Sequence, residues 1–397
     1  MPLDLHSERG VPLDRQVFTW RELAGTPHSK LDDDAFTRVR IILMNGVEAN
    51  QGRFLHACAR MNRDLQPELA RVRRVDHFQQ VMVNWLLPPD LSPLETTIAF
   101  EQVAVEVTAS VALAEPNPYL AQAYRFGMLE DYDHLYRFAA LLDRLEGKDA
   151  NSITQCYTDI SPGRPTSIEH RAPEDDLRDG YDKATAAPIS KLNALLITAA
   201  EHQTRDYYMT IGPQFADPVA RALYAEIASI EEQHVTHYES LSDTTESWLE
   251  KWLLHECTEV WAYWSCHQAE TNPRFKAIWE RMLAYELGQL HHVMQLFKTV
   301  EQRDPAEIVP ATLPDAVDFR SHRQFVRDVL SREVDLRAVG TRFVEAGKEP
   351  ADGPSARQRA HLNAGGSPSE AVAAGYRWAP GGEINRLLGA IGATGRA

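Results

Sequence analysis

The stretch SIEEQHVTHYES, residues 229–240, places Glu231 and His234 three residues apart within a sequence of helical periodicity. Residues at i and i+3 lie on one face of a helix, so this carboxylate and this imidazole point in the same direction. Glu232 and His237 fall within the same two turns. A solvated helix surface can have this composition, and so can a metal site. The neighbouring sequence decides between them.

A second carboxylate lies at the matching height of the preceding predicted helix. Glu201 precedes Glu231 by 30 residues, and the turn sequence GPQFADP, residues 212–218, falls between them. In an antiparallel helix pair, residues about 15 positions either side of the turn stand roughly 22 Å from it, at the same level. We therefore expect Glu201 to face Glu231 and His234.

The same spacing occurs earlier in the chain. Glu101 precedes Asp131 by 30 residues, His134 follows three residues later, and the turn EPNP, residues 115–118, lies between the two acids. The composition predicts about 0.3 such matches by chance, so one match carries little weight. Two matches, each centred on a turn, indicate a shared site built from two helical hairpins.

Apolar residues recur at intervals of three and four from residue 33 to about residue 300, which predicts an all-α fold. Segments rich in proline, glycine and asparagine divide this region into neighbouring helical hairpins with short turns. The expected helices span residues 34–61, 66–86, 93–114, 118–146, 188–212, 217–241, 245–270 and 273–301.

The remaining segments define the expected domain organisation. Residues 1–32 are turn-rich and are expected to form an irregular arm, and 33–303 to form one helical domain. Residues 147–187 are rich in proline, glycine and charge, as suits a long crossover between two hairpins. The C-terminal part, 304–397, is expected to contain a linker, one helix near 320–346 and a flexible tail. Residues 347–368 have the composition of a mobile surface segment.

The two hairpins and the crossover resemble the ferritin-like di-iron carboxylate superfamily, which includes rubrerythrins and ferritins. The resemblance implies a ferritin-like four-helix bundle over residues 93–241, extended by the additional hairpins 34–86 and 245–301. It also implies two bound metal ions, iron or alternatively manganese. The implied ligands are Glu101, Asp131, His134, Glu201, Glu231 and His234.

This sequence departs from the family pattern at one ligand position. Asp131 stands where the family has a glutamate, and Glu130 beside it is an alternative ligand. His237, one turn after His234, is expected to support the site or to lie at the surface. Glu232 is expected to be solvated.

The outer hairpins carry fainter versions of the same pattern. Glu256, Glu286 and Gln289 repeat the spacing with glutamine in place of histidine. In the first hairpin Glu48, Asp76 and Gln79 repeat it with a spacing two residues shorter. Because glutamine is a poor iron ligand, these residues are interpreted as a degenerate or supporting copy.

The resemblance implies an oxidoreductase that activates O₂ or peroxide and oxidises a small organic substrate. The four cysteines form no C-x-x-C pair, so the electrons are expected to come from an external donor or a reducing substrate. Two alternatives remain open at this stage. One is a peroxide-detoxifying or iron-handling protein, and the other is a metal-free helical scaffold.

Composition restricts the partners. With 57 acidic and 41 basic residues the chain has a formal charge of −16, which favours neither nucleic acid nor an anionic membrane. The N-terminal sequence lacks the apolar segment of a signal peptide, and a cytoplasmic location is expected. The outer hairpins are expected to line an access channel or to form a homodimer face.

Overall fold

A computed structural model describes residues 3–32 and 34–379. It is 67% helix and 3% strand, so the all-α class predicted from the sequence is confirmed. The eight long helices lie within three residues of their predicted bounds. They are α2 (Ala35–Met61), α3 (Gln66–Asn84), α4 (Pro93–Ala114), α5 (Pro118–Glu146), α8 (Pro188–Ile211), α9 (Pro218–Glu239), α10 (Trp248–Ala269) and α11 (Pro273–Val300).

Side-chain caps fix where these helices begin. Ser92 before α4 and Ser247 before α10 each accept a hydrogen bond from the backbone N–H three residues later, and a glutamate there returns the bond. Asn117, Asp217 and Asn272 cap α5, α9 and α11, and proline occupies the first turn of all three. The turn sequences therefore start the helices as well as separating them.

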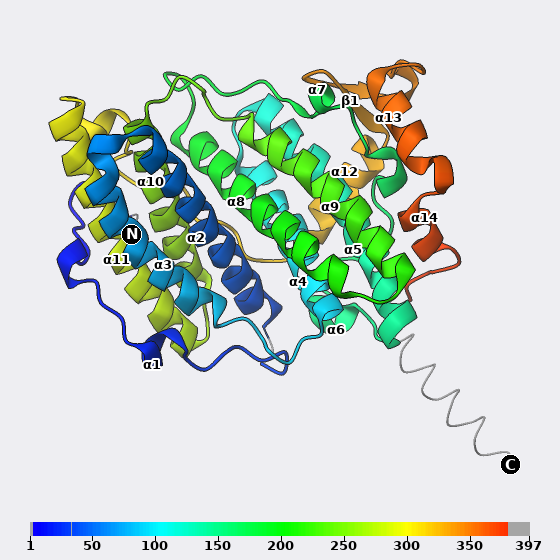
Figure 1. Ribbon diagram of the computed structural model, residues 1–397, viewed down its shortest axis with the longest axis horizontal. Coiled ribbons are helices and arrows are strands. Elements are labelled where there is room, and N and C mark those ends of the chain that lie inside the picture. Colours follow the sequence, from blue (N-terminus) through cyan, green and yellow to red (C-terminus); the bar gives the residue numbers. More distant parts are fainter. Residues whose placement is uncertain (1–2, 33, 380–397) are drawn as a thin grey trace, which may run out of the picture.

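The long helices form two groups of four (Figure 1). We call α4, α5, α8 and α9 the central quartet, and α2, α3, α10 and α11 the flanking quartet. Helix α2 packs against α8 and α4, so the two quartets share a continuous apolar core. Helix α4 is mainly apolar and is buried over almost its whole length. In the described part of the chain it alone has the length and composition of a membrane span, and 89% of that stretch is buried inside the protein.

The crossover, residues 147–187, lies directly on α5. It contains two short helices, α6 (Asn151–Thr154) and α7 (Pro173–Asp176). A Cβ atom on Gly163 would stand 2.4 Å from the carbonyl oxygen of Leu129, so only glycine permits this approach. The Gly163 N–H donates to Asp133 at 3.0 Å. The crossover is thereby held against the outer side of the central quartet.

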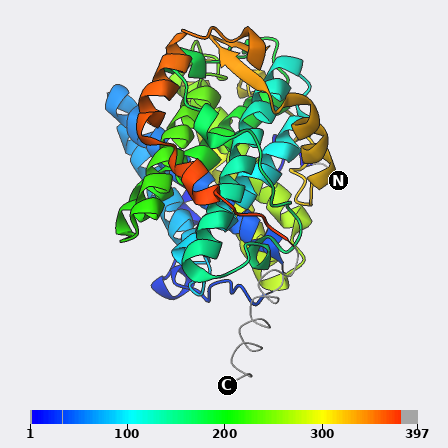
Figure 2. The same ribbon diagram turned by 90° about the vertical axis from the view of Figure 1, so that its right-hand side faces the viewer.

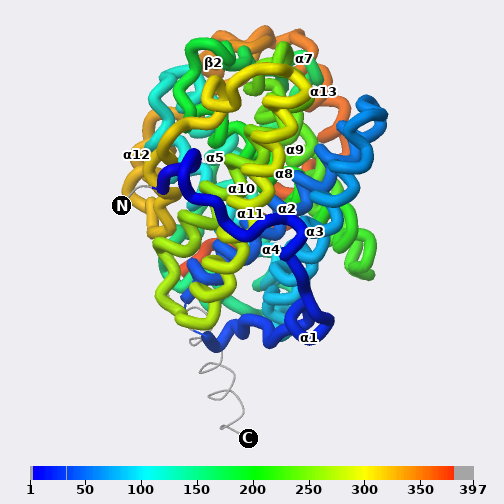
Figure 3. The backbone as a smooth tube through the Cα atoms, turned by 90° about the vertical axis from the view of Figure 1, so that its left-hand side faces the viewer, coloured from blue at the N-terminus to red at the C-terminus, as the bar shows by residue number. Residues whose placement is uncertain are grey.

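The N-terminal arm runs across the flanking quartet (Figure 3). It contains the short helix α1 (Trp20–Leu23), and the backbone N–H of Val11 donates to the carbonyl of Ala284 in α11 at 2.7 Å. Near the start of the arm, Asp4 pairs with Thr312 in an isolated antiparallel bridge. These contacts join the N-terminal arm to α11 and to the segment that follows it.

The C-terminal segment corrects two predictions. The helix expected over 320–346 ends early, as α12 (Arg323–Glu333), and a hairpin of β1 (Leu336–Val339) and β2 (Arg342–Glu345) follows. Gly340 has a φ of 54° in the turn of this hairpin, a conformation that glycine adopts without strain. Val339 in β1 and Phe343 and Val344 in β2 favour extended structure over helix.

The segment 347–368, predicted to be mobile, instead includes the helix α13 (Pro354–Leu362) and is followed by α14 (Pro368–Ala373). Ser355 is buried, and its hydroxyl donates to Asp175 in the crossover. Figure 2 shows these two helices lying over the central quartet. Composition misjudged the segment because a long-range polar contact holds it in place. The rest of the predicted tail, 380–397, lies outside the described residues.

Candidate metal centre

The structure brings together all six residues that the sequence predicted as ligands. Each is at most 1% exposed, and the central quartet supplies them all. They are Glu101 of α4, Asp131 and His134 of α5, Glu201 of α8, and Glu231 and His234 of α9. The equal heights expected from the hairpin turns are therefore realised in the fold.

The six side chains form two overlapping groups, in each of which the possible ligand atoms lie within 4.8 Å of one another. One group contains Glu101 and His134, and the other contains Glu201 and His234. Asp131 and Glu231 belong to both groups. Each group offers three carboxylates and one imidazole, and both can hold a metal ion.

Both imidazoles turn the same nitrogen toward the carboxylates. Nδ1 of His134 lies 3.1 Å from Glu231 Oε1. Nδ1 of His234 lies 3.1 Å from Asp131 Oδ1, 3.3 Å from Glu231 Oε2 and 3.6 Å from Glu201 Oε2. Because the Nδ1 atoms face inward, the Nε2 atoms are left to make hydrogen bonds on the outer side.

Each Nε2 atom meets a buried carboxylate outside the six. Nε2 of His134 lies 2.9 Å from Glu169, and Nε2 of His234 lies 2.8 Å from Glu130. A carboxylate on the outer nitrogen fixes the ring orientation and raises the basicity of the inner nitrogen, as in many metal sites. The geometry distinguishes the positions of Asp131 and Glu130. Asp131 faces the shared centre, and Glu130 lies behind His234.

The crossover compensates the charge of Glu130. Arg171 donates to its Oε1 at 2.5 Å and Arg164 at 3.2 Å, and both guanidinium groups are buried. Burial favours the protonated acid, but Arg171 and the contact with His234 outweigh it and hold the pKa of Glu130 well below its usual range. Glu130 is therefore an ionised acceptor for His234.

Glu169, Arg171 and Arg164 were missed by the sequence analysis. All three come from the crossover, whose proline, glycine and charge were interpreted as a long connection between two hairpins. Burial raises the pKa of Glu169 to about 8. A signal was present in the segment RPTSIEHRAPEDD, residues 164–176, which is highly charged although it lies inside a compact domain.

The carboxylates at the centre have more oxygen atoms than hydrogen-bond partners. Apart from their ion-pair contacts with His234 Nδ1, neither oxygen of Asp131 or Glu201 has one, and one oxygen each of Glu101 and Glu231 lacks one. A buried carboxylate without compensation costs several kcal/mol, of the order of the penalty for an unpaired buried ion. Two divalent ions would neutralise the four acids and coordinate these oxygens. The donor set therefore fits two metal ions.

The pKa shifts at the centre follow from burial and from the opposite charges of its acids and imidazoles. Burial, ahead of repulsion from neighbouring acids, raises the pKa of Glu101 and Glu201 well above the usual value and also raises that of Asp131. The surrounding carboxylates outweigh burial and raise the pKa of His134 and His234. Metal binding displaces such protons, because coordinating histidine must be neutral and coordinating acids ionised.

Two tyrosines border the centre. The Tyr208 hydroxyl donates to Glu101 Oε1, which joins α8 to α4 at this level. The Tyr238 hydroxyl is fully buried and lies against Gly127, where a Cβ atom would stand 2.1 Å from it. Tyr208 is the tyrosine that orients a predicted ligand directly.

Residues near the predicted ligands occupy the expected peripheral positions. Glu232 is exposed and forms an ion pair with Arg205 at 2.9 Å, as the sequence analysis predicted. His237 is buried, stacks on Phe126, and belongs to neither group of possible ligands. Burial holds the pKa of His237 well below its usual value, so its ring is neutral.

The fainter pattern in the outer hairpins also converges. Glu48, Asp76, Glu256 and Glu286 are buried in the flanking quartet, and Gln79 and Gln289 lie among them. The Gln289 side-chain amide donates to Gln79 at 2.9 Å and to Glu286 at 3.3 Å. The degenerate copy predicted from the sequence is thus a buried polar cluster with glutamine where the central quartet has histidine.

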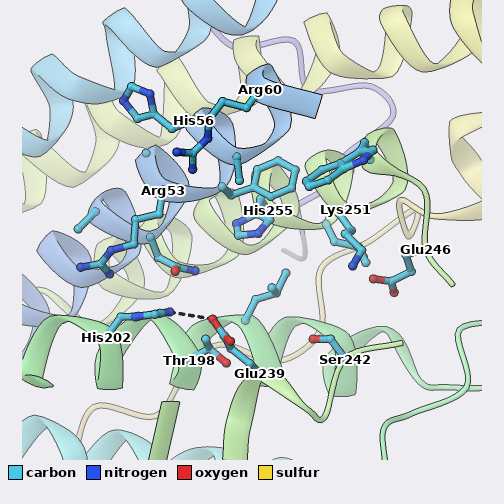
Figure 4. Close-up of a pocket in the computed structure, with 18 of the residues that line it drawn as sticks. Arg53, His56, Arg60, Thr198, His202, Glu239, Ser242, Glu246, Lys251 and His255 are labelled. Atoms are coloured by element: carbon cyan, nitrogen blue, oxygen red, sulfur yellow. Dashed lines mark hydrogen bonds and ion pairs between the residues drawn. The ribbon is translucent and has the colours of Figure 1, made fainter. Parts of the chain in front are cut away.

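A surface cavity of about 870 Å³ lies between the two quartets (Figure 4). Its walls come mainly from α2, α8 and α10, with Arg53, His56 and His255 on one side and the His202–Glu239 pair on the other. None of the six predicted ligands is among its lining residues. Helix α8 presents Thr198 and His202 to the cavity and Glu201 to the centre, so the cavity and the centre lie on different faces of this helix.

No protein-family model matches the chain, and neither a curated protein nor a solved structure matches it. The chemistry of the centre therefore has to be argued from its own residues.

Proposed function

We propose that this chain is a ferritin-like, non-haem dimetal oxidoreductase that activates O₂ or peroxide. The observation that carries the proposal is the presence of Asp131 and Glu231 in both groups of possible ligands. Two separate single-ion sites have no need of shared carboxylates, whereas a dimetal centre has bridging ones. Two iron ions bound there would supply the electrons that reduce the oxidant, and manganese accepts the same ligands.

The protein would hold the ions symmetrically. His134 with Glu101 would hold one ion and His234 with Glu201 the other, and Asp131 and Glu231 would be available to both. Glu169 and Glu130 fix the imidazole rings from outside, and Tyr208 fixes Glu101. Each fixed side chain reduces the entropy lost when an ion binds.

The burial of the centre favours a small oxidant. With all six side chains at most 1% exposed, a molecule of the size of O₂ or hydrogen peroxide reaches the centre with little displacement of the helices. An organic substrate needs either a local opening or electron transfer from outside. The proposed class of reaction is therefore reduction of the oxidant, coupled to oxidation of a small organic substrate or of an external donor.

The same burial favours a second candidate function, the removal of peroxide with electrons from an external donor. A peroxide-removing protein needs no pocket for an organic substrate at the metal ions. Iron handling would use the same six residues. A metal-free scaffold is the least favoured alternative, because the four buried carboxylates among the six residues would then have two imidazoles to compensate them.

The test compares the iron-loaded wild type with the Asp131→Asn/Glu231→Gln variant. Protein loaded anaerobically with ferrous iron is mixed with O₂ and, separately, with hydrogen peroxide in the presence of a chemical reductant. We expect the wild type to consume oxidant over many turnovers. The variant should consume it no faster than free iron does. The relative rates with O₂ and peroxide distinguish the two oxidant classes. Wild-type rates equal to those of free iron with both oxidants would refute the proposal.

A further inference from the structure

We propose that the flanking quartet contains a second, chemically different metal site, which binds one hard divalent cation through oxygen atoms alone. Its core is formed by Glu48, Glu259 and Glu286, and Asp76, Glu256 and the carboxamide oxygen of Gln289 surround it. The inference does not rest on the proposed function, because none of these residues belongs to the central quartet.

Three helices converge at this point. Glu48 comes from α2, Glu259 from α10 and Glu286 from α11, and one carboxylate oxygen of each lies within 4.8 Å of the other two. Asp76 of α3 and Glu256 of α10 complete a cluster of five acids, each at most 2% exposed. Acids this deeply buried are rare unless they are paired or coordinate a metal.

Many oxygen atoms of the cluster have no hydrogen-bond partner. Both oxygens of Glu259 and both of Asp76 have no hydrogen-bond partner, and one oxygen each of Glu48, Glu256 and Glu286 also has none. The carboxamide oxygen of Gln289, a neutral side chain with no exposure, is unpartnered too. An amide oxygen left without a donor beside five acids marks a position where a cation is expected.

A buried acid outside the cluster, near the end of α10, is paired with an arginine. Glu270, at the end of α10, accepts from Arg40 at 3.0 Å and from the Trp279 indole at 3.1 Å. In contrast, none of the five clustered acids forms an ion pair with any residue in 3–32 or 34–379. The charge of Glu270 is therefore compensated by Arg40, whereas no cationic side chain among the described residues compensates the five clustered acids.

The chemistry of the donors selects the cation. Gln79 and Gln289 occupy the positions that correspond to His134 and His234, so imidazole nitrogen is replaced by amide. Glu259, one turn after Glu256, adds an acid where the central quartet has Thr204 after Glu201. Oxygen-only sites suit Ca²⁺, Mg²⁺ and Mn²⁺, whereas imidazole favours later transition metals. The change of residues turns a dimetal ligand set into a site for a hard ion.

The existing hydrogen bonds leave room for this ion. The Gln79 amide donates to Glu48 at 3.4 Å and also to Glu286, and the Trp252 indole donates to Glu256 at 2.7 Å. These donors hold one oxygen of each acid and leave the other oxygen free for a metal. One divalent ion compensates two acids, and the others can remain protonated donors within the cluster.

The ion would tie together helices that are distant in sequence. Glu48 and Glu259 are separated by 211 positions, and the central quartet lies between them in the chain. A closed, fully buried site of this kind is expected to take up its ion during folding and to exchange it slowly. Its role would be to join the first hairpin to the last.

The test measures metal content in protein purified from cells supplied with iron, manganese and calcium. Asp131→Asn/Glu231→Gln removes the bridging acids of the central quartet, and Glu259→Gln changes the flanking cluster with little change in shape. We expect the first variant to lose its iron and retain one Mn²⁺ or Ca²⁺ per chain. Adding Glu259→Gln should remove that ion.

The outcomes separate the two proposals. A folded Asp131→Asn/Glu231→Gln variant without a hard cation overturns the second site, whatever the wild-type iron content. If that variant does not fold, wild type and Glu259→Gln alone are compared. One hard cation fewer in Glu259→Gln supports the site, and equal content overturns it. A wild type that holds one hard cation and neither iron nor further manganese would refute the proposed function and leave the second site standing.

Discussion

Asp131 of α5 and Glu231 of α9 each lie within reach of both halves of the buried centre, so that neither half is complete without the same two acids. Each half adds its own glutamate and its own histidine. Two ions held there would be coupled through these common carboxylates, which come from α5 and α9. Loss of one shared acid should therefore affect both ions, whereas loss of one histidine should affect mainly one.

A comparison of two neighbouring histidines tests which of them binds metal. His234→Gln should reduce the metal content by at least one ion per chain, because its Nδ1 faces three carboxylates. His237→Gln, one turn later and equally buried, should keep the wild-type content, because His237 belongs to neither group. Elemental analysis of both purified variants provides the measurement. Equal losses in the two would contradict the assignment.

The hydrogen bond between Glu169 of the crossover and His134 should affect the affinity for metal ions more than the number of ions bound. Glu169→Gln replaces the carboxylate 2.9 Å from Nε2 and should weaken metal binding by about 10- to 100-fold. Competition with a chromogenic chelator measures this change.

The matched control is Glu226→Gln. It alters a similar carboxylate–imidazole contact in the same region, 3.3 Å from His170, but Glu226 also accepts from the Ser369 N–H and contacts no predicted ligand. If this control weakened metal binding as much as Glu169→Gln, the effect would reflect the packing of the crossover in general.

The close approach of the crossover to α5 can be tested at Gly163. An alanine there would place its Cβ 2.4 Å from a backbone oxygen and 2.7 Å from a backbone nitrogen, so the crossover must move. We expect Gly163→Ala to lower the free energy of unfolding by about 1–3 kcal/mol and to reduce metal retention, since Glu169 moves with the segment.

Gly52→Ala serves as the control because a Cβ at Gly52 in α2 meets nothing within 4 Å. It should be neutral or stabilising by up to about 1 kcal/mol, since alanine is the better helix former. Urea unfolding followed by circular dichroism compares the two variants. Metal retention in Gly163→Ala equal to that in Gly52→Ala would show that the approach to α5 does not position Glu169.

His28 should produce a pH dependence of stability that is independent of metal. It is 1% exposed, and burial, followed by repulsion from Arg38, lowers its pKa below the ordinary 6.5, although Asp32 and Glu270 oppose this. The unfolded chain therefore binds more protons at this residue once the pH falls below about 6.5. The contribution of His28 to the free energy of unfolding should be fully present above that pH. It should decline as the pH decreases toward the pKa of His28 in the folded protein.

Replacing His28 by glutamine should flatten the stability curve between the lowered pKa and pH 6.5. Thermal melts of wild type and His28→Gln across this range, in the presence of a metal chelator, provide the measurement. Parallel curves for the two proteins would exclude His28 as the source of the pH dependence.

The sequence predicted the helical hairpins and the six clustered residues because both depend on local patterns. Apolar periodicity fixed the helices, and the turns before Pro118 and Pro218 fixed which residues stand at the same height. Glu130 and Asp131 remained alternatives for one ligand position. The packing of α5 against α9 places them against different nitrogens of His234.

What could not be predicted depends on contacts between distant segments. Glu169 and Arg171 lie in the crossover, and no spacing rule relates them to the histidine and the acid that they contact. Glu259 had no counterpart in the repeated pattern and was not singled out, yet it lies at the core of the flanking cluster. The β-hairpin after α12 was missed because the amphipathic pattern was continued past residue 333.

The most direct test of the central claim is an anaerobic titration of metal-free protein with ferrous iron. A dimetal centre with shared acids predicts uptake that saturates at two irons per chain, with both lost in Asp131→Asn/Glu231→Gln. A folded wild type that binds no iron under these conditions, or a variant that binds as much as the wild type, would contradict it.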